Sequence, residues 1–374
     1  MKIARPIFYA VGLSVVIGAL AGCGGQTQPT SFSAGGLAGA SLRVPSGLDA
    51  IAAVKAMPLR VDHRKSWVSP EVARLPRILF VSDDSTNDVL LFSLPDLRLR
   101  GTLTGFEMPQ GLCSDTSGNI WVTNFGTLTV IELSRSGTVI NVLIDPDGYP
   151  VACAVDPTSG DLAVANLYNK YLSGSGEVEI YRAGGGTPTS LANPDQYYYN
   201  QVGYVTGSGS GNSDGHADVA PGNLFVDGRT YSGSFILSEL PAGSAAFHTV
   251  TLSGGTIYFP GMVQWYSPGN YLALGDQLCG DVPASCIYHV KISGNMGKIK
   301  GHTSLLNYLG GSVCDMVQGV IGAHGLRYVA GGDYEACGYA NSSVNRWAYP
   351  AGGTPTNFND SAVTEPIGAA ISTK

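Results

Sequence analysis

Charge is scarce in this sequence of 374 residues. Asp, Glu, Lys and Arg together make up 13% of it, about half the share usual in soluble domains. The net charge of −7 leaves no basic footprint of the kind that binds nucleic acid. No stretch with helical periodicity is long enough to anchor a helical domain. With 51 glycines available for turns, these absences favour an extracytoplasmic β-protein.

Familiar catalytic motifs are also missing. The sequence has six histidines but no HExxH pair, which argues against a catalytic zinc site. It has no GxSxG nucleophile elbow and no CxxC pair of metal ligands. The sequence therefore predicts no cofactor and favours a binding protein over an enzyme.

Residues 1–22 predict a lipoprotein signal peptide. A positively charged start precedes an apolar run, Ile7–Leu20, which is too short to span a bilayer comfortably. The run ends in Leu20-Ala21-Gly22-Cys23, which resembles the bacterial lipobox and implies cleavage before Cys23 and acylation of that cysteine. Since Gly24 rather than Asp follows, the resemblance implies a lipid anchor in the outer membrane of a bacterial cell envelope. The alternative is an ordinary secretory signal with an incidental cysteine.

Residues 23–74 predict a flexible tether. Gly24–Gly47 is rich in Gly, Ser, Thr, Ala and Gln. Leu48–Met57 has apolar residues at helical spacing after Ser46, which permits one short helix. From residue 75 to residue 374 the pattern changes to short strands separated by turns.

A two-strand unit repeats along this second part. Pro109–Asn124 predicts two strands joined by a tight turn, and Pro150–Asn166 repeats the pattern. A polar residue ends each second strand, at intervals of 41 to 61 residues. A period of this length with about four strands is typical of a β-propeller, so the sequence predicts an all-β domain of six blades. The strand-ending residues are Asp83, Asn124, Asn166, Asp227, Asp276 and Asp333.

The two ends of this domain are predicted to share one blade. Ile78–Asp83 looks like a second strand that lacks a first strand before it. Pro366–Ser372 matches the inner-strand pattern of Pro109–Asp115, and no second strand follows it. We therefore expect Pro366–Ser372 to pair antiparallel with Ile78–Val81, which removes an exposed sheet edge.

The repeat resembles that of NHL-type propellers and, more loosely, of bacterial lipoproteins that carry such repeats. This resemblance implies the fold and no activity. The residues that carry it are Pro109, Gly111, Asp115, Gly118, Asn119 and Asn124 in one repeat, and Pro150, Asp156, Gly160 and Asn166 in the next.

Six cysteines remain besides Cys23. An even number in an exported protein favours disulfides, for which fifteen connectivities exist, while six buried free thiols are the alternative. Cys279 and Cys286 flank one hairpin loop, so we expect them to pair. The sequence leaves the pairing of the other four open: Cys113, Cys153, Cys314 and Cys337.

The starts of the inner strands of a propeller converge at the mouth of its central channel, where we expect a binding site. Asp315 and Glu365 come from neighbouring blades there, and they either share a cation or a proton or remain solvated at the rim. The strand-ending Asp and Asn residues are instead expected to accept backbone N–H bonds in turns. The residues predicted at the mouth are Gln110, Tyr149, Asn200, Gln201, Phe259, Asp315 and Glu365.

Two further segments have two interpretations each. Tyr197–Tyr199 either forms a stacking platform for a sugar or peptide or, as we favour, packs between blades. Asp214–Asp218, within the Gly/Ser-rich insertion Gly207–Pro221, offers alternating polar ligands but is more typical of a loop.

The prediction as a whole is a monomeric, membrane-tethered propeller of the cell envelope that binds or scaffolds an unknown protein, peptide or carbohydrate. The alternative, at the level of the fold alone, is a gluconolactonase-like hydrolase with one divalent cation such as calcium in the channel. Only Asp315 and Glu365 offer acids at the mouth, with Gln110 and Asn200 as neutral ligands. This set is small for a metal enzyme, so the binding module is favoured.

Overall fold

The computed structural model describes residues 66–374, except 172–173, 207–218, 281, 283, 323–326 and 335–340. The predicted signal peptide, the lipobox cysteine Cys23 and the short helix at Leu48–Met57 lie outside the described residues. So do Asp214–Asp218 and Cys337. Within the described ranges, no helix has the length and apolar composition needed to cross a bilayer.

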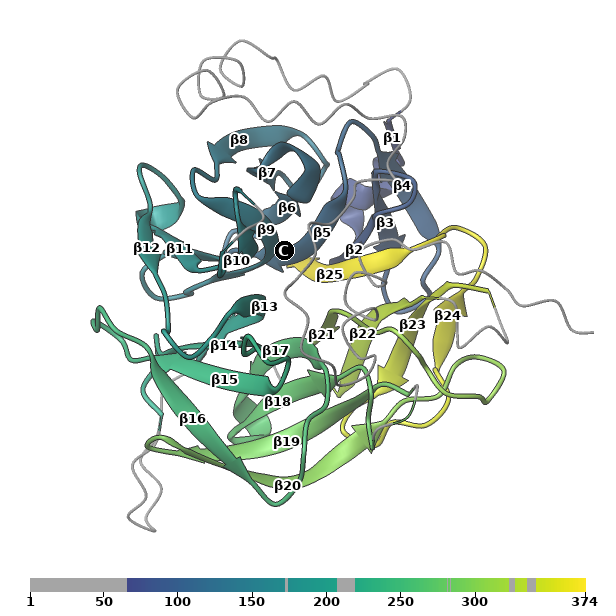
Figure 1. Ribbon diagram of the computed structural model, residues 1–374. Helices are drawn as coiled ribbons and strands as arrows, with labels where there is room; N and C mark the ends of the chain where they lie inside the picture. The colour runs from purple at the N-terminus through teal and green to yellow at the C-terminus, as the bar shows by residue number, and fades with distance from the viewer. Residues whose placement is uncertain are drawn as a thin grey trace, which may run out of the picture. The chain divides into compact units, whose positions relative to one another are not determined.

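The described chain consists of antiparallel meanders whose strands follow one another in sequence (Figure 1). One sheet has the order β5-β6-β7-β8, another β12-β11-β10-β9 and a third β21-β22-β23-β24. Their strands are β5 (Pro109–Ser114), β6 (Ile120–Asn124), β7 (Thr129–Leu133), β8 (Val139–Ile144), β9 (Gly148–Val155), β10 (Leu162–Asn169), β11 (Val178–Tyr181), β12 (Thr189–Leu191), β21 (Gly319–Ile321), β22 (Tyr328–Asp333), β23 (Ser343–Ala348) and β24 (Asn357–Asn359).

The largest sheet has eight strands in the order β13-β14-β15-β16-β20-β19-β18-β17. It consists of two meanders whose outer strands, β16 and β20, pair in parallel over three residues each. The expected sequence of separate four-stranded sheets is therefore interrupted here, because two outer edges hydrogen-bond to each other. The strands are β13 (Tyr198–Tyr204), β14 (Leu224–Arg229), β15 (Phe235–Leu240), β16 (His248–Ser253), β17 (Pro260–Tyr266), β18 (Tyr271–Asp276), β19 (Cys286–Ser293) and β20 (Met296–Ser304).

The remaining sheet joins the two ends of the domain, as predicted. Its order is β1-β4-β3-β2-β25, and β25 lies beside β2 although they are far apart in sequence (Figure 1). Ile78 pairs with Ser372 and Val81 with Ala369 in antiparallel register. β1 pairs with β4, so the folded domain includes residues before the predicted start at 75. The strands are β1 (Trp67–Val68), β2 (Arg77–Asp83), β3 (Asp88–Ser93), β4 (Leu99–Leu103) and β25 (Pro366–Thr373).

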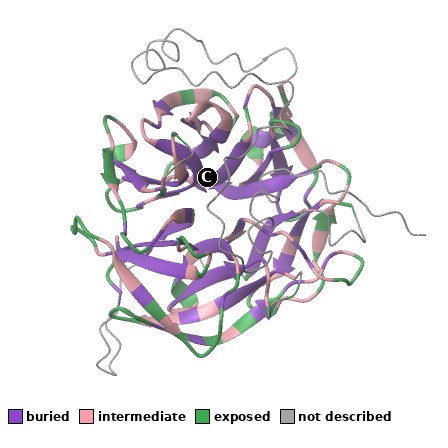
Figure 2. Ribbon diagram, in the orientation of Figure 1, coloured by how far each residue is buried: buried purple, intermediate pink, exposed green. Residues whose placement is uncertain are grey.

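The innermost strands contact one another in a closed cycle: β25, β5, β9, β13, β17, β21 and β25 again. Figure 2 shows that the strands around this centre are buried, whereas the exposed stretches lie mainly in outer strands and loops. Glycine permits the close approach, because a Cβ at Gly111 would meet Val151 O at 2.6 Å and one at Gly368 would meet Gln110 O at 2.3 Å. This is a propeller-like arrangement of sheets.

Apolar residues fill the spaces between neighbouring sheets. Leu79 and Phe92 of the first sheet, for example, belong to the same buried cluster as Ala330 and Val344 of the β21–β24 sheet. Further clusters occupy the other interfaces. Strands such as β2, β6 and β22 are buried along nearly their whole length, so both faces of their sheets pack against neighbouring sheets.

The repeated turn forms as its residues predict. The Asp115 carboxylate accepts N–H bonds from Ser117 and Asn119, both at 2.8 Å, and Gly118 has φ +81°. In another sheet, the carboxylate of Asp83, which ends strand β2, accepts N–H bonds from Thr86 and Thr364. The turn-capping role predicted for the strand-ending residues is confirmed for Asp83.

The same role is confirmed for Asn124, whose Oδ1 accepts the N–H of Glu107 at 2.7 Å. Asn166 was expected to do likewise, but it donates from Nδ2 to the carboxylates of Asp145 and Glu177, both at 3.1 Å. The Asn166 prediction is therefore wrong, because two acids lie where backbone N–H groups were expected.

Two disulfides are present among the described residues. Cys279 pairs with Cys286, as predicted, and Cys113 pairs with Cys153. The second bond joins the innermost strands β5 and β9 of neighbouring sheets. Cys314 is also disulfide-bonded, so the alternative of six free thiols is wrong.

Candidate functional site

Several residues predicted at the channel mouth are packing residues. Tyr149 is buried and its ring lies 4.7 Å from that of Phe125, centroid to centroid. Gln201 is buried, and its N–H donates to the Asp227 carboxylate at 2.7 Å. Asn200 and Phe259 are half-buried.

The acids of the mouth are held by backbone bonds. The N–H of Glu365 donates to the Asp83 carboxylate at 3.2 Å, and Asp315 forms a backbone bridge with Tyr334. Asp84, which sequence analysis missed, donates its N–H to the carbonyl of Glu365 at 3.0 Å. Burial, followed by the charge of Asp83, raises the pKa of Asp84 to about 6.

The metal centre required by the hydrolase alternative would need several converging ligands. Within the described ranges, no group of three or more His, Cys, Asp or Glu side chains is arranged to hold a metal ion. Asp315 and Glu365 are therefore not part of such a group.

Gln318 ties three innermost strands together near the centre. Its Oε1 accepts N–H bonds from Leu112 of β5 and Ala369 of β25, both at 2.9 Å. Its Nε2 donates to the carbonyl of Leu112 at 3.0 Å. Because Gln318 immediately precedes β21, this one buried side chain fixes the spacing of β21, β5 and β25.

Aromatic side chains gather at the end of the sheets where second strands finish and innermost strands begin. The ring of Tyr198 is in edge contact with Tyr168 at 5.4 Å and with Tyr197 at 4.8 Å, and Tyr197 contacts Tyr231 at 5.1 Å. We call Tyr168, Tyr197, Tyr198 and Tyr231 the tyrosine cluster. Edge-to-face contacts of this kind hold the rings in defined orientations.

The tyrosine cluster is bordered by a cation. Arg229 pairs with Tyr198 across β14 and β13, and its guanidinium lies 5.0 Å from the ring centroid of Phe259. Tyr199 differs from its neighbours: it is fully buried and its hydroxyl accepts the N–H of Asn193 at 2.7 Å. The packing interpretation of Tyr197–Tyr199 is thus confirmed for Tyr199, while Tyr197 remains partly exposed.

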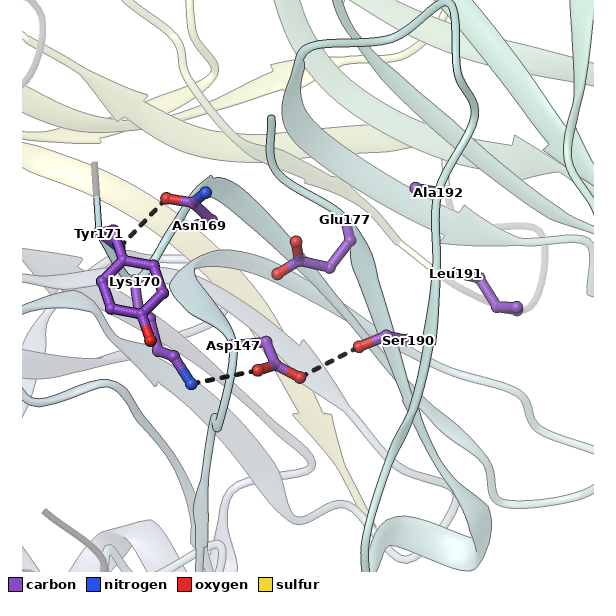
Figure 3. A pocket seen from close by; sticks show the side chains of 8 residues that line it. All are labelled: Asp147, Asn169, Lys170, Tyr171, Glu177, Ser190, Leu191 and Ala192. Atoms are coloured by element: carbon purple, nitrogen blue, oxygen red, sulfur yellow. Dashed lines mark hydrogen bonds and ion pairs between the residues drawn. The ribbon is translucent and has the colours of Figure 1, made fainter. Parts of the chain in front are cut away.

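A cavity of about 330 Å³ is lined in part by Asn169 and Tyr171, which follow Tyr168 of the tyrosine cluster in the sequence. Figure 3 shows its lining side chains. We call it the acidic pocket. Asp147 joins two sides of it, since its carboxylate accepts a bond from Ser190 Oγ at 3.4 Å and pairs with Lys170 Nζ at 3.4 Å. The lining residues are Asp147, Asn169, Lys170, Tyr171, Glu177, Ser190, Leu191 and Ala192.

Two more carboxylates lie behind the lining of the acidic pocket. Glu179 faces Ser190 across β11 and β12 and accepts a bond from its hydroxyl through Oε1. The Asn166 Nδ2 group donates to the carboxylates of both Asp145 and Glu177. Both side chains are at least 99% buried, and Asp145 Oδ2 and Glu179 Oε2 have no hydrogen-bond partner.

Burial of these acids makes their ionisation costly. It raises the pKa of Glu177 to about 7 and that of Asp145 well above its ordinary value, and the charge of Glu179 adds to the effect at Asp145. Burial also raises the pKa of Glu179. Lys170 is the one cation among the lining residues, beside the two carboxyl groups of Asp147 and Glu177.

The acidic pocket and the tyrosine cluster are continuous. The N–H of Gly176 donates to the carbonyl of Tyr197 at 2.9 Å, and Tyr168 forms a backbone bridge with Ser175. Glu177 follows directly in the chain. Sequence analysis missed this site, although Glu177 and Glu179 alternate with the buried Val178 and Ile180, a pattern that places both acids on one face of a strand.

No protein-family model and no curated protein sequence matches the chain. Among solved structures, a chain of a nidogen/laminin complex superposes with a TM-score of 0.57 at 11% identity, over 79% of this chain and 98% of that chain. A protein of unknown function from Bacteroides caccae gives a TM-score of 0.54 at 12% identity, over 80% and 100%. These structures are β-propellers, and likeness at such low identity shows the fold alone.

Proposed function

We propose that the chain is a lipid-anchored, six-bladed propeller of the bacterial cell envelope that binds a partner protein through its tyrosine-bearing end. The cycle of six innermost strands supports this count if the eight-stranded sheet is taken as two blades. The repeats at Pro109 and Pro150 support an NHL-type propeller, and the lipobox at Cys23 supports the anchor.

The observation that carries the binding proposal is the exposure of tyrosine at one end of the sheets. Tyr171 is 72% exposed and Tyr231 70%, and both follow second strands, β10 and β14. Tyr258, which precedes the innermost strand β17, is 40% exposed. Second strands end where innermost strands begin in an antiparallel meander, so the three lie at the same end.

Tyrosine in this setting suits protein recognition. A Tyr side chain offers a large amphipathic contact surface with little rotamer entropy to lose, and Tyr and Arg are enriched among the residues that dominate binding energy. The ring contacts of the tyrosine cluster already restrict two of its members, Tyr197 and Tyr231. An interface built on them would lose less conformational freedom on binding.

Site-specific crosslinking tests the proposal. A photoreactive phenylalanine analogue at position 231 should form a discrete adduct in intact cells. The matched control is Met296, which is also exposed but begins β20, next to the turn that follows β19 at the other end of the sheet. No adduct at position 231, or the same adducts from both positions, would contradict binding through this end.

The anchor has its own test. Cys23→Ser removes the acylated cysteine, so the variant should move from the membrane fraction to the soluble fraction, since stable anchoring requires buried acyl chains. A variant that still sediments with membranes after a high-salt wash would count against the lipid anchor.

A further inference from the structure

The acidic pocket suggests which chemistry the bound partner presents. Its lining combines two carboxylates, Asp147 and Glu177, with an exposed aromatic ring, that of Tyr171. A cation is the natural complement to both, through ion pairing with the acids and cation–π contact with the ring.

The lysine already present does not neutralise the site. Lys170 Nζ donates to the carbonyl of Pro146 at 2.9 Å, pairs with Asp147 at 3.4 Å and lies 5.5 Å from the ring centroid of Tyr171, so it leaves the Glu177 carboxylate without a cation. Glu177 receives one bond from the Asn166 amide, which carries no charge. Figure 3 shows the Glu177 carboxylate pointing into the space between Asn169 and Asp147.

An independent sign of a missing positive group lies behind the lining. Asp145 and Glu179 are at least 99% buried, and one oxygen of each is unpartnered. The Glu179 carboxylate is on the same side of the β11–β12 pair as Ser190, which lines the pocket, so it is directed toward the cavity. A buried carboxylate without a full set of partners is stabilised by a nearby positive charge.

From these contacts we infer that the acidic pocket is a recognition site for a basic side chain, a lysine or arginine of the partner protein that the tyrosine cluster contacts. This deepens the proposed function and rests on it. The cation enters between Glu177 and Asp147, beside Lys170 and the ring of Tyr171. The partner's surrounding surface then covers the tyrosine cluster, which is joined to the pocket through Gly176 and Tyr197.

The test uses the full-length chain and n-butylguanidinium, which reproduces the end of an arginine side chain. Binding is followed by NMR at millimolar ligand, and the neutral isostere n-butylurea measures the contribution of charge. We expect n-butylguanidinium to bind and n-butylurea to bind at least about tenfold more weakly, a difference of about 1.4 kcal/mol. Equal binding of the two, or no binding of either, would overturn the inference.

Two variants locate the binding. Glu177→Gln keeps an oxygen that accepts the Asn166 bond but removes the charge, and should weaken guanidinium binding about tenfold, or about 1.4 kcal/mol. Asp195→Asn removes an exposed charge that precedes β13 at the same end and should leave binding unchanged. Equal losses in the two variants would reject the pocket in favour of general electrostatic attraction.

Calcium provides the competing outcome. If calcium at equal concentration displaced n-butylguanidinium, and Glu177→Gln abolished that effect, the pocket would be a metal site and the inference would be wrong. The crosslink at position 231 separates the two proposals. A persistent adduct without guanidinium binding would reject the pocket assignment and leave the proposed function intact.

Discussion

Gln318 offers the sharpest test of how the innermost strands are held together. Its side-chain oxygen accepts two backbone N–H bonds, from Leu112 and Ala369, and its nitrogen donates to the Leu112 carbonyl. The change Gln318→Leu keeps the approximate volume but removes all three bonds. Both N–H groups belong to buried residues, so water cannot replace the lost partner without opening the centre.

The expected magnitude follows from this count. A buried donor left without a partner costs about 1–3 kcal/mol, so the two N–H groups together cost about 2–6 kcal/mol of unfolding free energy. Gln264→Leu is the matched control. Gln264 makes an analogous link to Ile321, but it is half-buried and accepts only one N–H bond, at 2.8 Å. We expect about 1–3 kcal/mol for the control.

Urea unfolding of both variants measures these differences, and amide hydrogen exchange locates them. The amides of Leu112 and Ala369 should lose protection in Gln318→Leu and keep it in Gln264→Leu. A loss below about 1 kcal/mol for Gln318→Leu, or a loss no larger than that of the control, would refute the role assigned to this side chain.

Three further results are expected. Deletion of Glu365–Lys374 removes β25 and exposes the edge of β2. The truncated protein should therefore aggregate, or lose far more stability than removal of a frayed tail would cost. A melting temperature within a degree or two of that of the intact protein would contradict ring closure. Replacing Cys113 and Cys153 together by Ala opens a loop with a sequence separation of 40 and should cost about 2–4 kcal/mol by urea unfolding, whereas an unchanged midpoint would mean that the bond adds nothing. Burial raises the pKa of Glu177 to about 7, so between about pH 4.5 and 7 the folded state keeps a proton that the unfolded state releases. The free energy of unfolding should therefore fall as the pH rises from about 4.5 to 7. Calorimetry should show a weaker fall in Glu177→Gln.

The fold of this domain could be predicted largely from sequence patterns, because each repeat contains both the strands of a hairpin and the residues that form its turn. Pro109–Asn124 contains both strands of a hairpin and the Asp115 side chain that closes its turn. The pairing of Pro366–Ser372 with Ile78–Val81 spans nearly the whole domain, yet it too follows from pattern, because each segment lacks the partner that every other repeat has. The parallel pairing of β16 with β20 leaves no such signal, since it joins only three residues of each strand and is not repeated elsewhere among the described strands.

The candidate site was harder to predict because its parts come from different connections. Glu177 and Asp147 line one cavity although 29 other residues separate them in the sequence. Asn166 looks like a turn-capping residue by position and proves to bind two carboxylates. The mouth residues were predicted from the convergence of inner strands in a propeller, which gives a position along each strand but no side-chain contacts. Gln201 is buried and its N–H is bonded to Asp227, a contact that the repeat pattern does not specify.

The parallel pairing of β16 and β20 has a consequence for how the domain moves. Backbone hydrogen bonds run without interruption from β13 through the outer strands and back to β17, so these eight strands behave as one cooperative unit. The two meanders cannot move apart independently. Such a motion would break the backbone hydrogen bonds between Thr251–Ser253 of β16 and Met296–Lys298 of β20. Local opening of the ring is therefore expected at the other interfaces between sheets. Among the described residues, these interfaces are joined by side chains, by the Cys113–Cys153 disulfide and by isolated backbone bonds such as the one from Gly176 to Tyr197.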